Sequence, residues 1–162
     1  MSTGAQQGQW VLLAYRLPRE PSTPRSSVWR KLKRLGVAQL ADGLVTLPAD
    51  ARTREALEWI AEEVVDNGGE ATLWLGQPAD TAEAAALAEK MNAAITAEYQ
   101  NVTAQAREAR SDEPASRRRV AARLQRELHR IAARDFFSAP GGETARRAVE
   151  ALAAQDRTPA RT

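Results

Sequence analysis

Residues 10–36, WVLLAYRLPREPSTPRSSVWRKLKRLG, decide the fold that the sequence predicts. They begin with an apolar run from Trp10 to Tyr15, in which the side chains of both alternating sets are apolar. A strand of this kind is covered on both faces, so we expect it in the middle of a sheet. The rest of the chain is interpreted outward from this strand.

A basic helix follows the strand after a proline-rich loop. Proline is excluded from strand and helix interiors, which makes residues 18–23 a tight loop. Thr23 can cap the helix, and Pro24 is a favoured first helical residue. Gly36 ends it as the left-handed residue after the last turn. Its apolar stripe, with spacings of four and three, consists of Val28, Leu32 and Leu35.

The segments after Gly36 complete a β-α-β-β-α-β order. Asp42-Gly43 predicts a hairpin turn with positive φ at both positions, between short strands at 37–41 and 44–47. Asp50 or Thr53 can cap a second helix, which Asn67-Gly68-Gly69 ends. A last strand follows near residues 71–75. This order predicts a ferredoxin-like fold, in which two helices cover one face of a four-stranded antiparallel sheet.

The second half of the sequence is helical, so the predicted class is α+β. Helices are expected over about 81–110 and 116–134, and a last one around Val149. Their apolar stripes are too thin for isolated helices, so we expect them to pack back on the sheet. The predicted organisation is a disordered 1–8, a ferredoxin-like domain at 9–78, a helical extension at 79–154 packed on that domain, and a frayed tail at 155–162.

Composition argues against several classes of function. The chain of 162 residues has no cysteine, which excludes disulfides, thiolate nucleophiles and cysteine-ligated metals. No apolar run approaches the ~20 residues of a membrane span, and MSTGAQQGQ does not resemble a signal peptide. A cytoplasmic protein is therefore expected. The chain has a single histidine, His129, and a lone histidine at such a position is more often a structural group than a catalyst. We expect no catalytic residues, no metal and no cofactor.

Charge is separated into blocks along the chain. Residues 1–35 hold seven basic groups and one acid, a net charge of +6. Residues 42–98 hold three basic groups and twelve acids, a net charge of −9. Residues 115–134 hold seven arginines and one acid, again +6. Such blocks indicate a polyanionic or acidic partner, or basic and acidic blocks that face one another within the fold.

Two clusters of basic side chains are candidate sites for DNA or an anion, since arginine suits bidentate contacts with phosphate and other oxyanions. The side chains of the first cluster span about 80° of the circumference of one helix, at ~100° per residue. Its members are Arg119, Arg123, Arg126, Arg130 and Arg134. The second cluster consists of Arg16, Arg19, Arg25, Arg30, Lys31, Lys33 and Arg34. The alternatives are pairing of the first cluster with acidic helices at 50–66 or 80–98, and a plain solvated face at 30–34.

Several distinctive motifs follow one another along the chain. The first two are W-x-L-L-x-Y-x-L-P-x-E-P-S-x-x-R and W-R-x-L-x-R-L-G. After them come the D-G hairpin that ends in L-P, then R-E-A-L-E-W, G-G-E-A and R-D-F-F-x-A-P-G. In this order they resemble the N-terminal domain of the ChrB chromate-resistance regulators, over about residues 9–153. More distantly, the first half is similar to the Cas2-like ferredoxin fold of PaaX-type transcriptional repressors.

The resemblance implies a cytoplasmic regulator of chromate-resistance genes that responds to chromate, an oxyanion. No catalytic residue transfers, because Tyr15-Arg16-Leu17 stands where a Cas2-like nuclease has its aspartate. Regulators of the ChrB type continue into a second domain, which this chain stops before, and no separate winged helix is expected. The matched basic residues are Arg16, Arg19, Arg25, Arg30, Arg34 and Arg134.

Three classes of function follow from these observations. The first is a non-enzymatic regulatory module that binds duplex DNA, or chromate or another oxyanion, through its arginines. The second is an interaction module that forms a homodimer or docks a separate C-terminal-domain partner. The third, a metal-dependent nuclease, has the least support. No partner at a membrane is expected.

Overall fold

The computed structural model describes residues 8–157 and divides the chain into two compact units. The first unit ends at Leu87 and the second begins at Ala88. Helix α3, Thr81–Glu108, belongs to both, so the division falls inside a helix rather than at the predicted boundary after residue 78. That the helices pack on the sheet stays a prediction, and each unit is described by itself.

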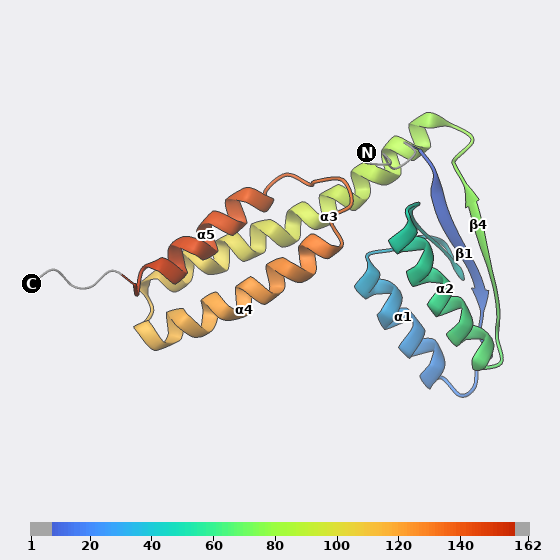
Figure 1. The fold of residues 1–162 in the computed structure, drawn as a ribbon, viewed down its shortest axis with the longest axis horizontal. Helices are drawn as coiled ribbons and strands as arrows, with labels where there is room; N and C mark the ends of the chain where they lie inside the picture. Colours follow the sequence, from blue (N-terminus) through green and yellow to red (C-terminus); the bar gives the residue numbers. More distant parts are fainter. Residues whose placement is uncertain (1–7, 158–162) are drawn as a thin grey trace, which may run out of the picture. The chain divides into compact units, whose positions relative to one another are not determined.

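The first unit has the predicted β-α-β-β-α-β order (Figure 1). Its sheet is antiparallel with the strand order β2-β3-β1-β4, and α1 and α2 lie on one face of it. The α+β class is thereby confirmed. The elements are β1 (Trp10–Arg16), α1 (Thr23–Leu35), β2 (Ala38–Ala41), β3 (Leu44–Pro48), α2 (Ala51–Asp66) and β4 (Glu70–Gly76).

Strand β1 is central, as its apolar sequence predicted. On one face Val11 and Leu13 are fully buried, whereas on the other Trp10 is buried but Leu12 and Ala14 are only half-buried. Complete cover on both faces, which the sequence predicted for β1, is therefore absent from the second face. Burying a leucine side chain stabilises the folded state by about 1.5–3 kcal/mol, so the face with Val11 and Leu13 dominates the packing of β1.

Capping residues in the sequence predicted most of the helix ends of the first unit correctly. Gly36 follows α1 in the left-handed region, with φ of 82°. Asp50 and Thr53 are both caps of α2: the Asp50 carboxylate accepts from the Thr53 N–H at 2.7 Å, and the Thr53 hydroxyl accepts from the Asp50 N–H at 3.0 Å. Thr23 is not the cap of α1 but its first residue, and Ser22 before it makes no side-chain capping bond.

The turn between β2 and β3 differs from the predicted one. Asp42-Gly43 connects the strands, but of the two only Gly43 has a positive φ, 73°. The register shifts between Gln39 and Ala41, which places an irregularity of the bulge type in β2. A single left-handed glycine with a bulge replaces the turn with two positive φ values, because the extra residue takes up the twist.

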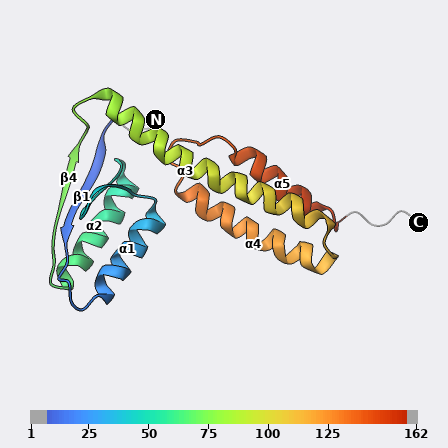
Figure 2. The same ribbon diagram turned by 180° about the vertical axis from the view of Figure 1, so that it is seen from behind.

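The second unit consists of three helices that run side by side (Figure 2). They are the larger part of α3, then α4 (Pro114–Ala133) and α5 (Gly142–Ala154), with a short 3-10 turn at Ala109–Ser111. Their stripes pack against one another in a core of their own. This core includes Ile95, Tyr99, Val102, Leu124, Ile131, Val149 and Leu152.

The predicted disordered N-terminus and frayed tail fall largely outside the described residues. Gly8 and residues 155–157 are described as turns. The Asp156 carboxylate forms an ion pair with Arg117 inside the second unit, so residue 156, which the prediction assigned to the frayed tail, is held there. Within residues 8–157, no helix combines the length and the apolar character needed to cross a membrane.

Candidate nucleic-acid and anion interface

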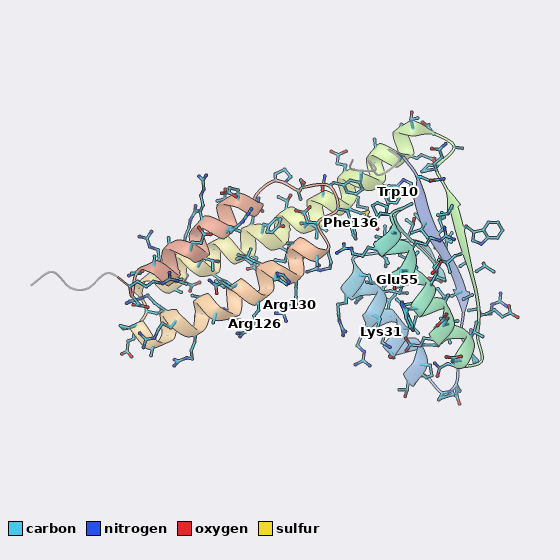
Figure 3. The ribbon with its side chains drawn as sticks, viewed as in Figure 1. Trp10, Lys31, Glu55, Arg126, Arg130 and Phe136 are labelled. Atoms are coloured by element: carbon cyan, nitrogen blue, oxygen red, sulfur yellow. The ribbon has the colours of Figure 1, made fainter. Side chains whose placement is uncertain are left out.

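Helix α4 presents a row of exposed arginines. Arg119, Arg123, Arg126 and Arg130, hereafter the α4 row, are all exposed and are spaced by four, three and four residues. The row is about 16 Å long at ~1.5 Å of rise per residue. Arg126 and Arg130 extend from α4 into solvent (Figure 3). The row is a straight, positively charged edge.

The α4 row has few acidic neighbours. The closest acid to Arg123 is Glu127 on the same helix, with 3.6 Å between Nη1 and Oε2. The side chains of Arg119, Arg126 and Arg130 form no ion pair or hydrogen bond with any described residue of the second unit. Among the described residues of the second unit, pairing with the acidic helix at 80–98 is thus found at the last member of the first cluster alone. Arg134 donates to both carboxylate oxygens of Glu98 in α3, at 2.8 and 3.0 Å.

The inward side of α4 fixes the direction of the row. Leu124 and Ile131 are completely buried in the helical core. Arg117 also faces inward, where its guanidinium donates to the carbonyl of Asp112 and forms an ion pair with the carboxylate of Asp156. The side chains of Arg117 and Asp156 are 14% and 11% exposed. Contacts on one side leave the opposite side to the α4 row. Sequence reasoning missed the Arg117–Asp156 pair, since no local pattern signals a contact between residues so far apart.

Helix α1 uses part of its charge internally. Lys31 Nζ lies 2.7 Å from Glu63 Oε2 of α2, and Lys33 Nζ lies 5.5 Å from the centroid of the Trp29 ring. Arg30 and Arg34 are exposed, without an ion pair to a described residue. At ~100° per residue the four basic positions from 30 to 34 spread over about 160° of the helix. They form no row comparable to that of α4.

Arg16 and Arg25 of the second cluster come together at a hollow of about 660 Å³ at the end of β1. Tyr15, Trp29 and two serines also line it. Burial raises the pKa of the Tyr15 hydroxyl, the charge of Arg25 opposes this shift, and Asp42 adds to it. Arg19 is exposed on the loop and does not line the hollow.

A second hollow, of about 470 Å³, lies between α4 and α5 and is lined in part by His129, Gln125 and Arg146. At its base the Tyr99 hydroxyl donates to Asp135 Oδ2 at 3.0 Å. Burial, together with this bond, raises the pKa of Tyr99 to about 12. Tyr99 therefore stays protonated, and His129 is exposed at the rim.

Catalytic and metal sites have little support in this geometry. Among residues 8–157, no group of three or more histidine or carboxylate side chains is placed to hold a metal ion. His129 forms no hydrogen bond with any described residue, although a general base needs a partner to orient it. The surfaces described above are marked instead by exposed arginines.

The comparisons with known proteins agree with the motifs. The family described as "Protein ChrB, N-terminal" matches residues 25–113, more than half of the chain. Protein ChrB of Cupriavidus metallidurans is 33% identical over 130 residues, which cover 79% of this chain and 40% of that protein. The chain thus spans about two fifths of the relative's length. On these matches, the chain belongs to the N-terminal family of the ChrB chromate-resistance regulators.

Proposed function

We propose that this chain is a non-enzymatic regulatory module that binds duplex DNA in the cytoplasm through phosphate contacts of the α4 row. The observation that supports the proposal most is that three of the four arginines in the row are exposed and have no acidic partner among the described residues of their own unit. Family membership adds to it, since regulators of resistance genes act on DNA. The charged row supplies a physical means of doing so.

The dimensions of the row suit a duplex. A row of about 16 Å corresponds to about five base pairs at ~3.4 Å per base pair along one strand. Guanidinium groups bind phosphate oxygens in bidentate fashion. Their desolvation costs little free energy, because they are weakly hydrated. Contacts of this kind hold DNA without reading its sequence. They release counterions, so binding should weaken steeply as salt increases.

Titration of a short labelled duplex, followed by fluorescence anisotropy, tests the proposal. Replacing Arg123, Arg126 and Arg130 with Gln should weaken binding to every duplex sequence alike. The slope of log K against log salt should become shallower by about 2.7, or about 0.9 per lost contact. At 0.1 M salt this corresponds to a loss of affinity of about 10²–10³-fold.

A control variant separates the row from net charge. Arg107, Arg146 and Arg147 are also exposed, and the last two pair with Glu143 of α5 at 2.9 and 3.1 Å. Replacing these three with Gln removes the same charge and should change the slope by less than about 1. Equal losses in both variants would contradict a specific role for the α4 row.

The second candidate function is binding of a small oxyanion effector, such as chromate, in the hollow at the end of β1. Two guanidinium groups at one hollow, Arg16 and Arg25, favour it. With no cysteine in the sequence, a protein thiol cannot reduce chromate here, so the anion would be bound and not transformed. An effector of this kind acts by its differential affinity for two states of the regulator.

Calorimetry with sulfate and with chromate tests the effector site. Reversible binding should weaken at least tenfold in Arg25→Gln, which removes a lining group of the hollow. Arg19→Gln removes the same charge from the neighbouring loop and should leave the affinity nearly unchanged. Binding that is equal in the two variants, or absent from the wild type, would contradict the effector site.

A further inference from the structure

Helix α2 carries a second exposed row that mirrors the α4 row. Glu55, Trp59, Glu62 and Asp66, hereafter the α2 row, are all exposed and are also spaced by four, three and four residues. At ~100° per residue they fall within about 60° of one another on the helix. Trp59 is 66% exposed, the largest fraction among the exposed large hydrophobic side chains of the described residues. Glu55 extends from α2 in Figure 3.

The carboxylates of the α2 row are unpaired, whereas their neighbours are not. Glu58 pairs with Arg54 at 3.1 Å, and Glu63 pairs with Lys31 at 2.7 Å. Glu55, Glu62 and Asp66 form no ion pair or side-chain hydrogen bond with any described residue of the first unit. The α2 row is therefore three free carboxylates around an exposed indole. It is complementary to the α4 row in charge and equal to it in length.

We propose that the α4 row of one copy of this protein docks on the α2 row of a second copy. The spacing of four, three and four reads the same from either end, so two antiparallel helices bring all four positions into register. Arg119 then meets Asp66, Arg123 meets Glu62, Arg126 meets Trp59, and Arg130 meets Glu55. Every copy carries both rows, so two copies can make the contact twice, with the α4 row of each on the α2 row of the other, and we take the assembly to close in this way as a dimer.

The chemistry of the two rows supports this pairing over a purely apolar dock. Arginine over a tryptophan ring is a favourable cation–π arrangement, and here ion pairs would surround it. Single exposed ion pairs contribute little, but a dimer would hold six of them in two rows. Because salt screens the attraction between exposed charges, the dimer should dissociate as ionic strength rises.

The dock would also regulate DNA binding by the α4 row, a consequence that rests on the proposed function. DNA phosphates and the α2 row of a second copy would compete for the same arginines. Self-association therefore masks the DNA-binding edge, and DNA separates the copies. A variant that cannot dock should bind DNA at least as tightly as the wild type does.

Sedimentation equilibrium of the full chain tests the dock over a range of concentration and salt. The wild type should pass from one copy to two as concentration rises at low salt. Glu55→Lys with Glu62→Lys should raise the dissociation constant at least tenfold, and Trp59→Ala should also weaken association. Glu83→Lys with Glu89→Lys changes the same charge at exposed positions of α3 and should leave the dissociation constant unchanged.

A charge exchange gives the sharpest outcome. Glu62→Arg and Arg123→Glu should each weaken association, and the double variant should recover it. The mass of a single copy at all concentrations, or equal effects of the α2 and α3 variants, would overturn the dock while leaving DNA binding by the α4 row intact. If the duplex titration fails but association depends on both rows, the dock stands and the DNA-binding proposal falls.

Discussion

Helices α1 and α4 are both rich in basic residues, yet they use them differently. In α1 the charges are spread around the helix, with Lys31 engaged by Glu63 and Lys33 lying over Trp29. In α4 the inward cation Arg117 is paired, while the α4 row remains exposed on one edge. The comparison teaches that the number of arginines does not identify an interface. Regular spacing together with few acidic partners is the basis on which we propose α4 as the interface.

The largest expected effect concerns the inward cation of α4. Arg117→Met leaves the carboxylate of Asp156 without its ion-pair partner, although both side chains are largely buried. Removing one member of a buried pair costs about 3–5 kcal/mol of unfolding free energy. Urea denaturation of the variant should show this loss, because the charge left behind is not solvated.

Two further variants sharpen this prediction. Arg118→Met removes an exposed neighbour and should change the unfolding free energy by less than about 0.5 kcal/mol. Arg117→Met with Asp156→Leu replaces both charges by apolar groups and should recover most of the loss, since such exchanges are often neutral. A single variant as stable as the wild type would mean that inward and outward arginines of α4 do not differ.

A smaller effect is expected at Tyr99, which braces the end of α4 through Asp135. Tyr99→Phe removes a hydrogen bond to a carboxylate and should cost about 1–3 kcal/mol near neutral pH. The pKa of Tyr99 is raised to about 12, above the ~10 of an unfolded chain. The folded state thus retains the proton more strongly, and its stabilisation is complete below pH ~10 and lost as pH rises toward 12.

Unfolding measured from neutral pH to pH ~11.5 checks the Tyr99 prediction. The difference in unfolding free energy between wild type and Tyr99→Phe should be constant up to pH ~10 and then shrink. A difference that grows at alkaline pH has the wrong sign for a raised pKa and would contradict the assignment of the bond to Asp135.

The smallest effect is expected in α1. Lys31 and Glu63 form a pair whose side chains are 47% and 26% exposed. Lys31→Met should therefore cost no more than about 1 kcal/mol, and the cost should vanish at high salt. Thermal unfolding at low and high ionic strength measures it. A cost as large as that of Arg117→Met would remove the distinction between the two helices.

Much of the first unit could be predicted because its signals are local. The two-sided apolar character of β1, the glycine after α1, and the Asp50 and Thr53 caps each act within a few residues. The predicted type of the turn at Asp42-Gly43 was wrong. A bulge in β2 supplies the twist that a second residue with positive φ was expected to supply. Periodicity does not reveal bulges.

The candidate site was predictable in its spacing but not in its partners. The sequence shows that the α4 row lies on one side of a helix, because helical geometry is regular. Pairing of Arg134 with Glu98 and of Arg117 with Asp156 depends on which helices pack together, and no local pattern encodes this. The α2 row was not predicted as a site, although Trp59 among its carboxylates was a signal that could have distinguished it.

The central claim is that spacing and missing partners, not charge count, make α4 the anion-binding helix. It is tested most directly by the salt dependence of duplex binding for two matched triple variants. One replaces Arg123, Arg126 and Arg130 with Gln, and the other replaces Arg30, Lys33 and Arg34 with Gln. Our account predicts that the first makes the slope shallower by about 2.7, whereas the second changes it by less than about 1. Equal changes, or a larger change for the α1 variant, would contradict it.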